Sequence, residues 1–460
     1  MKKLLLIGNG PLPNEQAPIR TAAGLRTYQF LQPLLARADL SIQLVTIAMP
    51  EAYNGVVHLK NIHHNERFWQ VMVSKDDPKL LEVLQQAHDD FQPDAILSVN
   101  TYPSFITSQL RFSAPWWADL NGWIMAEAQA QAFKMESDDY LPHYYKMEEA
   151  VVQRADKFST VSKSQAAALL GELASCGRLN SKTFGYQFAT SIQNGTEWFA
   201  GEEKKSHAAD HLLSHLPKDA FILLWVGGYN TWVDEETLFR AVDGALSQCP
   251  NLYFVSTGGV LPGLDNVTFD RFQKLIAESA CKDRYIFLGW LKQEEVTGLY
   301  GLADAGLNVD RQCVETLTGA RNRINEMMKF GLLVISTLGS EIVDSMVQAQ
   351  AGVAVESGNF QALTKAIHLL YEDKKNNQSQ KLSEYGKNGQ HFIQEQCNYK
   401  FLIRPFEEWL KQPMVAPDRG LQLSLQKSST LKSGLRYLRQ QGLRKFLLKL
   451  RQKFHYNGRR

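Results

Sequence analysis

The sequence predicts an α/β protein with two doubly wound domains that face a cleft, followed by a basic amphipathic helix. Short apolar runs alternate with helical patterns in the first half of the chain, as expected for buried parallel strands, and the alternation restarts near residue 220. The 460 residues also exceed the ~250 to 300 at which a single core usually divides. The third observation is that the end of the chain is strongly basic.

The first domain is predicted to span residues 1–200. Its strands are expected at residues 4–7, 41–47, 95–99, 116–120, 157–161 and 189–193. Residues 21–37 carry leucines and a tyrosine at helical spacing, so they should form the helix of a βαβ unit. A further helix is expected at about residues 144–154. The apolar run at residues 4–7 is too short for the hydrophobic region of a signal peptide. We therefore interpret it as the first buried strand.

The second domain is predicted to span residues 201–398, with a hinge region at 204–217. Strands are expected at residues 221–226, 252–256, 284–288, 305–309, 332–336 and 353–355. A crossover helix should occupy 399–412, with its helical pattern at 401–410, and a linker should occupy 413–430. No window approaches the ~18 to 20 apolar residues of a transmembrane helix.

The basic tail over residues 431–460 stands apart from the rest of the chain. From Gly420 to Arg460 there are eleven Lys or Arg residues and no Asp or Glu, whereas the preceding residues carry a net charge of minus nine. Leucines recur at helical spacing within it, which predicts an amphipathic helix on an anionic membrane surface. The alternatives are docking on the acidic body, disorder, or nonspecific nucleic-acid binding; specific recognition of nucleic acid is not expected.

The five cysteines are odd in number and widely spaced, without a C-x-x-C pair, which argues against a disulfide framework and against a zinc site. We therefore expect a cytoplasmic protein, attached peripherally to the inner face of the membrane if the tail binds lipid.

The stretch from Thr318 to residue 331 is the leading site candidate. It predicts a turn containing Gly319 that leads into a basic helix, and a helix N-terminus beside arginines suits a diphosphate. Arg323 is favoured over Arg321 because Glu326 lies three residues further on the same side, where its carboxylate could accept hydrogen bonds from ribose hydroxyls. A surface salt bridge between Arg323 and Glu326 is the alternative.

Two glycine-containing loops follow predicted strands of the second domain. Gly227 and Gly228 follow the first strand, with Asn230 and Thr231 as hydrogen-bonding residues, and Gly258 follows the second strand. Glycine in such loops lets the backbone approach a ligand, although both could be ordinary strand-to-helix turns. Arg311, after a third strand, is expected to help Arg323 neutralise a departing diphosphate without a metal.

The first domain offers four weaker candidates. Asn9 and Arg26 lie in glycine-containing segments of the first βαβ unit, where the alternative is a tight turn. Asp119 ends an apolar stretch, as a catalytic carboxylate would, and Glu127 follows as an acceptor-side candidate. No Asp pair ends a strand and no histidine spacing fits a metal site, so neither a metal nor a cofactor is expected.

Several segments resemble the retaining glycosyltransferases of family 4, which have the GT-B fold of two Rossmann-like domains. The resemblance spans roughly residues 1 to 412 and is carried by residues 24–26, 158–162, 193–195, 225–232, 287–290 and 324–335.

In that family two glutamates separated by seven residues hold the donor sugar and its ribose. Glu326 matches the second glutamate, whereas the first would fall on Thr318. The family's Gly-Arg and Lys-Gly pair is replaced by Gly227, Gly228 and residues 230–232, so Arg311 and Arg323 would supply the charge. The loop after residue 288 resembles the base-contacting segment, which implies that backbone around Trp290 meets the nucleobase.

The resemblance implies a metal-independent retaining glycosyltransferase of the hexosyl type. It would move a sugar from a nucleoside diphosphate sugar to the hydroxyl of a glycan or lipid-linked acceptor, as in surface polysaccharide assembly. The alternatives are a non-catalytic nucleotide-sugar-binding scaffold at the membrane and a GT-B nucleotide-sugar epimerase. A phosphorylase would need a Schiff-base lysine, and the motif offers only Lys329 at the far end of its helix.

Overall fold

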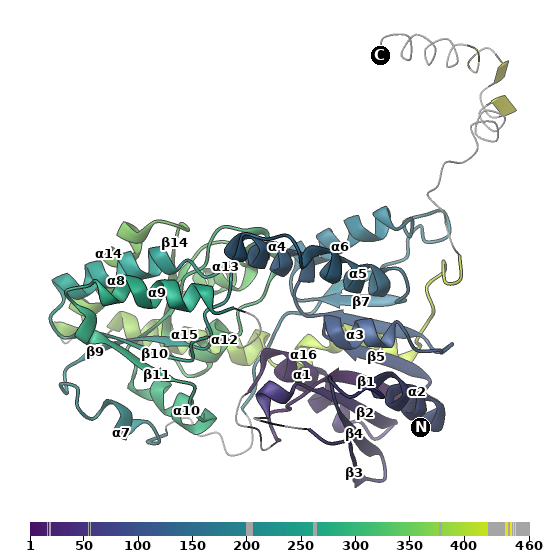
Figure 1. Ribbon diagram of the computed structural model, residues 1–460, viewed down its shortest axis with the longest axis horizontal. Helices are drawn as coiled ribbons and strands as arrows, with labels where there is room; N and C mark the ends of the chain where they lie inside the picture. Colours follow the sequence, from purple (N-terminus) through teal and green to yellow (C-terminus); the bar gives the residue numbers. More distant parts are fainter. Residues whose placement is uncertain are drawn as a thin grey trace.

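The computed structural model describes residues 1–15, 17, 20–53, 55, 57–198, 206–260, 265–376 and 380–421, together with residues 438, 439, 442, 443, 445 and 447. Two sheets, each covered by helices on both faces, lie side by side (Figure 1). This arrangement confirms the predicted pair of doubly wound domains. None of the described helices is long and apolar enough to cross a membrane.

The sheet of the first domain has the strand order β3-β4-β2-β1-β5-β6-β7-β8. Its strands are β1 (Lys2–Asn9), β2 (Leu40–Ala48), β3 (Lys60–Asn65), β4 (Phe68–Ser74), β5 (Ala95–Val99), β6 (Trp116–Leu120), β7 (Lys157–Thr160) and β8 (Ala189–Ser191). All neighbours are parallel except β3 and β4. The sequence predicted six of these strands and missed β3 and β4. Strand β3 is mostly exposed and polar, so it lacks the apolar run of a buried strand.

Alternate residues of β1 face opposite layers of helices. Leu5 and Ile7 pack toward one layer of helices, whereas Leu4 and Leu6 pack toward the other layer and toward the C-terminal helix over residues 404–411. The helices of this domain are α1 (Ala22–Leu35), α2 (Leu80–Phe91), α3 (Thr101–Thr107), α4 (Ile124–Met135), α5 (Leu141–Val152) and α6 (Lys163–Ser175), with a 3-10 turn η1 (Pro50–Ala52). Both faces of the sheet are therefore buried.

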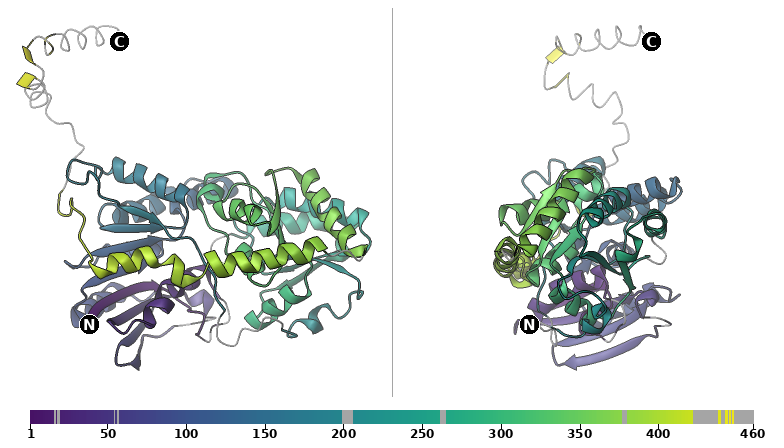
Figure 2. Two further views of the ribbon diagram at one scale, coloured as in Figure 1. Left: turned by 180° about the vertical axis from the view of Figure 1, so that it is seen from behind. Right: turned by 90° about the vertical axis from the view of Figure 1, so that its left-hand side faces the viewer.

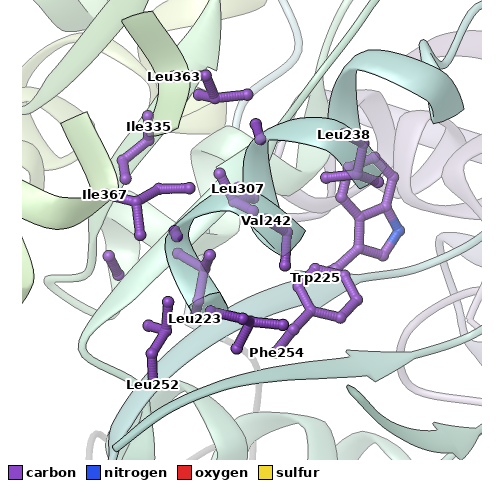
Figure 3. Packing of buried hydrophobic residues seen from close by; sticks show 14 of the residues in the cluster. Leu223, Trp225, Leu238, Val242, Leu252, Phe254, Leu307, Ile335, Leu363 and Ile367 are labelled. Carbon is purple, nitrogen blue, oxygen red and sulfur yellow. The ribbon is translucent and has the colours of Figure 1, made fainter. Parts of the chain in front are cut away.

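The sheet of the second domain is entirely parallel, with the order β11-β10-β9-β12-β13-β14. Its strands are β9 (Phe221–Val226), β10 (Leu252–Thr257), β11 (Tyr285–Gly289), β12 (Ala305–Asn308), β13 (Leu333–Thr337) and β14 (Gly352–Val355). Each overlaps a predicted strand. Leu223 and Trp225 of β9 pack with Leu238 and Val242 of helix α8 (Glu235–Gln248) on one face, and Leu363 lies in the same cluster (Figure 3).

The helices of the second domain cover both faces of this sheet. They are α7 (Asp210–Leu213), α8 (Glu235–Gln248), α9 (Val267–Ala277), α10 (Gln293–Leu302), α11 (Val314–Thr318), α12 (Asn322–Lys329), α13 (Glu341–Gln348), α14 (Phe360–Lys375) and α15 (Gln380–Gln396), with a 3-10 turn η2 (Lys282–Arg284). The predicted basic helix of the site candidate is α12, which ends just before Gly331.

The chain then crosses back onto the first domain. The helix predicted over 401–410 is split at Ile403 into α16 (Tyr399–Leu402) and α17 (Arg404–Lys411). Phe406 of α17 packs edge-on against Phe30 and Trp117, with ring centroids 5.8 and 5.4 Å apart. Figure 2 shows α15, α16 and α17 in yellow-green, running from the second domain across the first. This crossover ties the two domains together.

The segment predicted as a linker, residues 413–430, packs on the first domain as far as it is described. The Ala416 amide donates to Asp156, and Asp418 forms an ion pair with Arg178 at 2.9 Å. Of the predicted tail over 431–460, all but six residues lie outside the described residues, so the amphipathic helix stays a prediction.

Candidate functional site

The candidate site of the second domain lies where its strand order changes direction. Strand β9 pairs with β10 on one side and β12 on the other, and ligands of open α/β sheets bind beyond the carboxyl ends of strands at such a point. The loop after β9 is joined to the loop after β12, because the Arg311 amide donates to Trp232 and the Asp234 amide donates to Val309. Helix α12 begins beside these loops.

The Gly227 backbone adopts a left-handed conformation, with φ +90°, and a Cβ at this position would meet nothing within 4 Å. Gly258 is also left-handed, but a Cβ there would lie 2.3 Å from the Gly227 carbonyl oxygen. Gly258 therefore permits the close approach of two loops, whereas Gly227 borders open space. Of these two loops, the one at Gly227 therefore leaves room for a ligand.

Arg323, in the first turn of α12, reaches this glycine loop. Its Nη2 donates to the Gly228 carbonyl at 2.8 Å, and the guanidinium lies 4.2 Å from the ring centroid of Trp225. Within the described part of the chain Nη1 has no hydrogen-bond partner. Burial lowers the pKa of Arg323 to about 10, since the guanidinium is desolvated without forming an ion pair. An anion beside Nη1 would satisfy both the orphan donor and the charge.

Arg321, the neighbouring arginine, is occupied by carboxylates. Its guanidinium contacts Asp310 at 2.6 Å and Glu315 at 2.6 Å, and all three side chains are buried. Arg321 therefore holds α11 and the start of α12 against the end of β12. This agrees with the sequence-based preference for Arg323 as the ligand contact, which itself stays a prediction.

Arg311 is paired as well. It contacts Glu235 at 2.8 Å and Asp234 at 3.5 Å, and Glu235 also binds Lys134 of α4 at 2.5 Å. Lys134 belongs to the first domain, so the cluster is an ion-pair contact between the domains. Arg311 is therefore held by ion pairs and its side chain is 29% exposed, and the expectation that it helps to neutralise a diphosphate stays a prediction.

Glu326 lies one turn along α12, against the first domain. It accepts a hydrogen bond from the Thr196 hydroxyl and forms an ion pair with Lys329 at 3.0 Å. Its side chain is 16% exposed. The alternative of a salt bridge between Arg323 and Glu326 is wrong, since the two side chains contact different partners.

Thr318 and Gly319 are held by protein contacts. The Thr318 hydroxyl donates to Val314, and its carbonyl accepts from Ser162 of the first domain. The Gly319 amide donates to the Glu315 carbonyl at 2.7 Å. The Glu315 side chain points to Arg321, and the departure from the family motif at Thr318 stays a prediction.

The remaining donor-side candidates lie around the same loops. Thr231 is buried, and the Asn230 carbonyl accepts from the Val233 amide, which closes the loop after β9. Trp290 follows Gly289 at the end of β11, is 44% exposed, and donates from its indole to the Val260 carbonyl. A Cβ on Gly289 would meet nothing within 4 Å, so open space also borders the loop that carries Trp290.

Asp119 and Arg26 form a fully buried bidentate ion pair, at 2.7 and 2.9 Å. Arg26 also donates to the carbonyls of residues 192 and 193 and to Asn194. Neither side chain is exposed, which corrects the expectations that Asp119 is catalytic and that Arg26 contacts an acceptor. The pair joins α1, β6 and the segment after β8. Asn9, at the end of β1, is 3% exposed.

Glu127 lies in the first turn of α4, which packs against α11 of the second domain. Burial raises its pKa to about 8, with a smaller contribution from the nearby Glu315 carboxylate and an opposing one from Arg321. The carboxyl is therefore largely protonated at neutral pH. It can donate a hydrogen bond there, whereas it is a poor general base.

A relay of amide side chains connects the first domain to α12, and sequence reasoning missed it. Asn121 donates to Asn100 at 3.0 Å, while Asn194 donates to Asn121 at 3.2 Å and to Asn322 at 2.9 Å. Asn322 is the first residue of α12, directly before Arg323. The only signal in the sequence was that residues 193–195 carried part of the family resemblance.

Comparisons with known proteins concern the fold and the second domain. Residues 220–373 match the family model described as "Glycosyl transferases group 1". Sucrose-phosphate synthase from Thermosynechococcus elongatus is similar in structure, with a TM-score of 0.66, 18% identity, and coverage of 90% of this chain and 99% of that one. The chain has the GT-B fold.

Two further GT-B structures resemble the chain. Anabaena Alr3699/HepE in complex with UDP-glucose has a TM-score of 0.62 and 14% identity, covering 89% of this chain and 100% of its own. The α,α-trehalose-phosphate synthase from Burkholderia xenovorans, in complex with glucose-6-phosphate, has a TM-score of 0.62 and 10% identity with the same coverage. No curated protein matches the chain by sequence.

In the described part of the chain, no group of three or more His, Cys, Asp or Glu residues could hold a metal ion.

Proposed function

We propose that this protein is a glycosyltransferase that moves a sugar from a nucleoside diphosphate sugar to an acceptor hydroxyl. The observation that carries the proposal is the Arg323 guanidinium, which is buried beside the Gly227 loop, with Nη1 lacking a hydrogen-bond partner among the described residues. The group 1 match of the same domain supports a nucleotide sugar as the ligand, as does the structure of Alr3699/HepE with UDP-glucose.

In the proposed reaction the bond between the anomeric carbon and the diphosphate breaks while a bond to the acceptor oxygen forms. The leaving diphosphate gains negative charge, which Arg323 and the N-terminus of α12 would stabilise without rearrangement. Glu326 would accept hydrogen bonds from the ribose. The acceptor's proton would pass to the departing phosphate, because Glu127 is already protonated at neutral pH. We carry retention of configuration and metal independence over from the family resemblance.

The acceptor would bind on the first-domain side, beside Glu127 and the relay residue Asn121. We propose a glycan or lipid-linked acceptor, because the basic segment 431–460 suits the anionic inner surface of a membrane. Surface polysaccharide assembly is a process that would combine these features.

A non-catalytic nucleotide-sugar-binding protein is the second candidate. It is favoured by Thr318, which stands where the family has a carboxylate and whose hydroxyl donates to the Val314 carbonyl. Turnover separates the two candidates, since both bind donor but only the transferase releases nucleoside diphosphate.

The first test is a thermal-shift screen with UDP, GDP, TDP and ADP sugars on the wild type, Arg323→Ala and Arg271→Ala. Arg271 is an exposed arginine of α9 and serves as the matched control. One donor at ~100 times its dissociation constant should stabilise the wild type by about 2.7 kcal/mol. The same shift in Arg271→Ala and its loss in Arg323→Ala would support the site.

Equal stabilisation of Arg323→Ala would contradict the assignment of Arg323. Release of nucleoside diphosphate from the stabilising donor, with and without mixed glycan acceptors, then distinguishes a transferase from a binding protein. Donor binding without any release would favour the scaffold.

A further inference from the structure

The loop between α6 and β8, residues 177–187, presents two apolar side chains to solvent. Phe184 is 94% exposed and Leu179 is 49% exposed. Single exposed apolar residues are common, but a phenylalanine exposed to this degree contributes almost no burial to the fold. Its side chain is available to a partner.

This exposed loop is held in shape by its own hydrogen bonds. The Thr183 hydroxyl donates to the Arg178 carbonyl at 2.6 Å, the Tyr186 amide donates to Thr183 at 2.9 Å, and the Asn180 side chain donates to Gly177 at 3.1 Å. Because the turn is braced on both sides of Phe184, the ring is kept outside the body of the domain. A partner would pay little conformational entropy to order the loop.

The loop lies beside the place where the chain enters its basic segment. Arg178, at the base of the loop, pairs with Asp418, and the Leu421 amide donates to the Asp418 carbonyl at 2.9 Å. Leu421 is itself 40% exposed. From residue 422 onward the sequence has eleven Lys or Arg residues and no Asp or Glu. Figure 1 shows the yellow end of the described chain running along the first domain.

We propose that residues 177–187 form a membrane contact, with Phe184 and Leu179 inserted at the interface of an anionic lipid bilayer. The inference rests on the proposed membrane role of the basic segment and adds a second attachment point. A single weak membrane anchor gives marginal, reversible binding. Stable attachment requires two anchors, such as an inserted apolar group and a basic patch. The loop contains Lys182 and no acidic residue, so its own charge also suits anionic lipid.

The test is cosedimentation of the full chain with vesicles of phosphatidylcholine alone or mixed with phosphatidylglycerol, in the absence of nucleotide sugar. The variants are Phe184→Ser and Leu179→Ser. Leu369→Ser is the matched control, because Leu369 is a 56% exposed leucine on α14 of the second domain. Circular dichroism melting checks that each variant is folded. Light scattering reports whether the protein forms a dimer.

The expected result is binding of the wild type and Leu369→Ser to the mixed vesicles, with the partition coefficient of Phe184→Ser lower by about tenfold and that of Leu179→Ser lower by less. Unchanged binding of both loop variants would overturn the loop inference while leaving the basic segment as an anchor. No binding of the wild type would overturn both. A dimer that dissociates in Phe184→Ser, without vesicle binding, would assign the loop to a second copy instead. None of these outcomes depends on donor turnover.

Discussion

Replacing Asp119 by asparagine separates a structural carboxylate from a catalytic one. The substitution keeps the side chain's size but leaves the Arg26 guanidinium charged and fully buried. Removing one partner of a buried ion pair costs about 3 to 5 kcal/mol. We expect the lower end, about 3 kcal/mol, because Arg26 retains hydrogen bonds to carbonyls 192 and 193 and to Asn194. That is a large fraction of the ~5 to 15 kcal/mol by which domains are usually stable.

The assay is guanidinium or thermal unfolding followed by circular dichroism, with Asp39→Asn as the control. Asp39 pairs with Arg37 at 2.6 Å, but the Asp39 side chain is 64% exposed. Surface pairs of this kind contribute about 0 to 1 kcal/mol, so Asp39→Asn should hardly change the midpoint. For Asp119→Asn a fall in Tm of roughly 6 to 12 °C is expected. If both variants lost the same small amount, the argument from burial would be refuted.

Three other predictions concern the site. Asn194→Ala should break the amide relay, lower the free energy of unfolding by about 1 to 3 kcal/mol and weaken donor binding. Asn251→Ala, the control, loses an exposed hydrogen bond to Asp219 and should change neither stability nor binding. Calorimetric titration with donor measures the binding. The pKa of Glu127 is raised to about 8 in the folded protein. Below the unfolded pKa the carboxyl is protonated in both states and stability is unaffected. As pH rises from there to about 8, the unfolded state ionises more readily, so the free energy of unfolding falls progressively. Glu127→Gln should therefore raise the Tm relative to wild type at pH 9 but not at pH 4.5, and an equal effect at both pH values would contradict the shift. Gly258→Ala should destabilise the second domain strongly, because the new Cβ would clash with the Gly227 backbone. Gly227→Ala should destabilise it by only about 1 kcal/mol, since its Cβ meets no neighbour, but it should weaken donor binding. Urea midpoints and donor affinities of the two variants measure this contrast.

Most of the strands that the sequence predicted correctly are buried on both faces, although β8, β11 and β14 are largely half-buried. The mostly apolar strands β5, β6 and β9 have five, five and six residues, and their predicted bounds agree with the structure. Strand β3 forms the edge of the sheet, where one side is open to solvent and polar residues are tolerated, so it carries no comparable signal. Strand β4 lies between β3 and β2 and is mostly buried, so its apolar residues did carry a signal, which the sequence analysis missed.

The sequence by itself determined that the chain has two doubly wound domains, that helix α12 follows a glycine turn, and that the basic charge gathers at the end of the chain. These features depend on the order of neighbouring residues, which is what periodicity measures.

Only the tertiary structure decided which arginines pair with carboxylates. Arg26, Arg311 and Arg321 each form an ion pair with a carboxylate, whereas Arg323, among the described residues, donates to the Gly228 carbonyl and lies over the Trp225 ring. Asp119 is 93 residues from Arg26, and Glu235 is 76 residues from Arg311. Residues so distant in sequence are brought together by the folding of an entire domain. Local sequence patterns therefore do not predict these pairs.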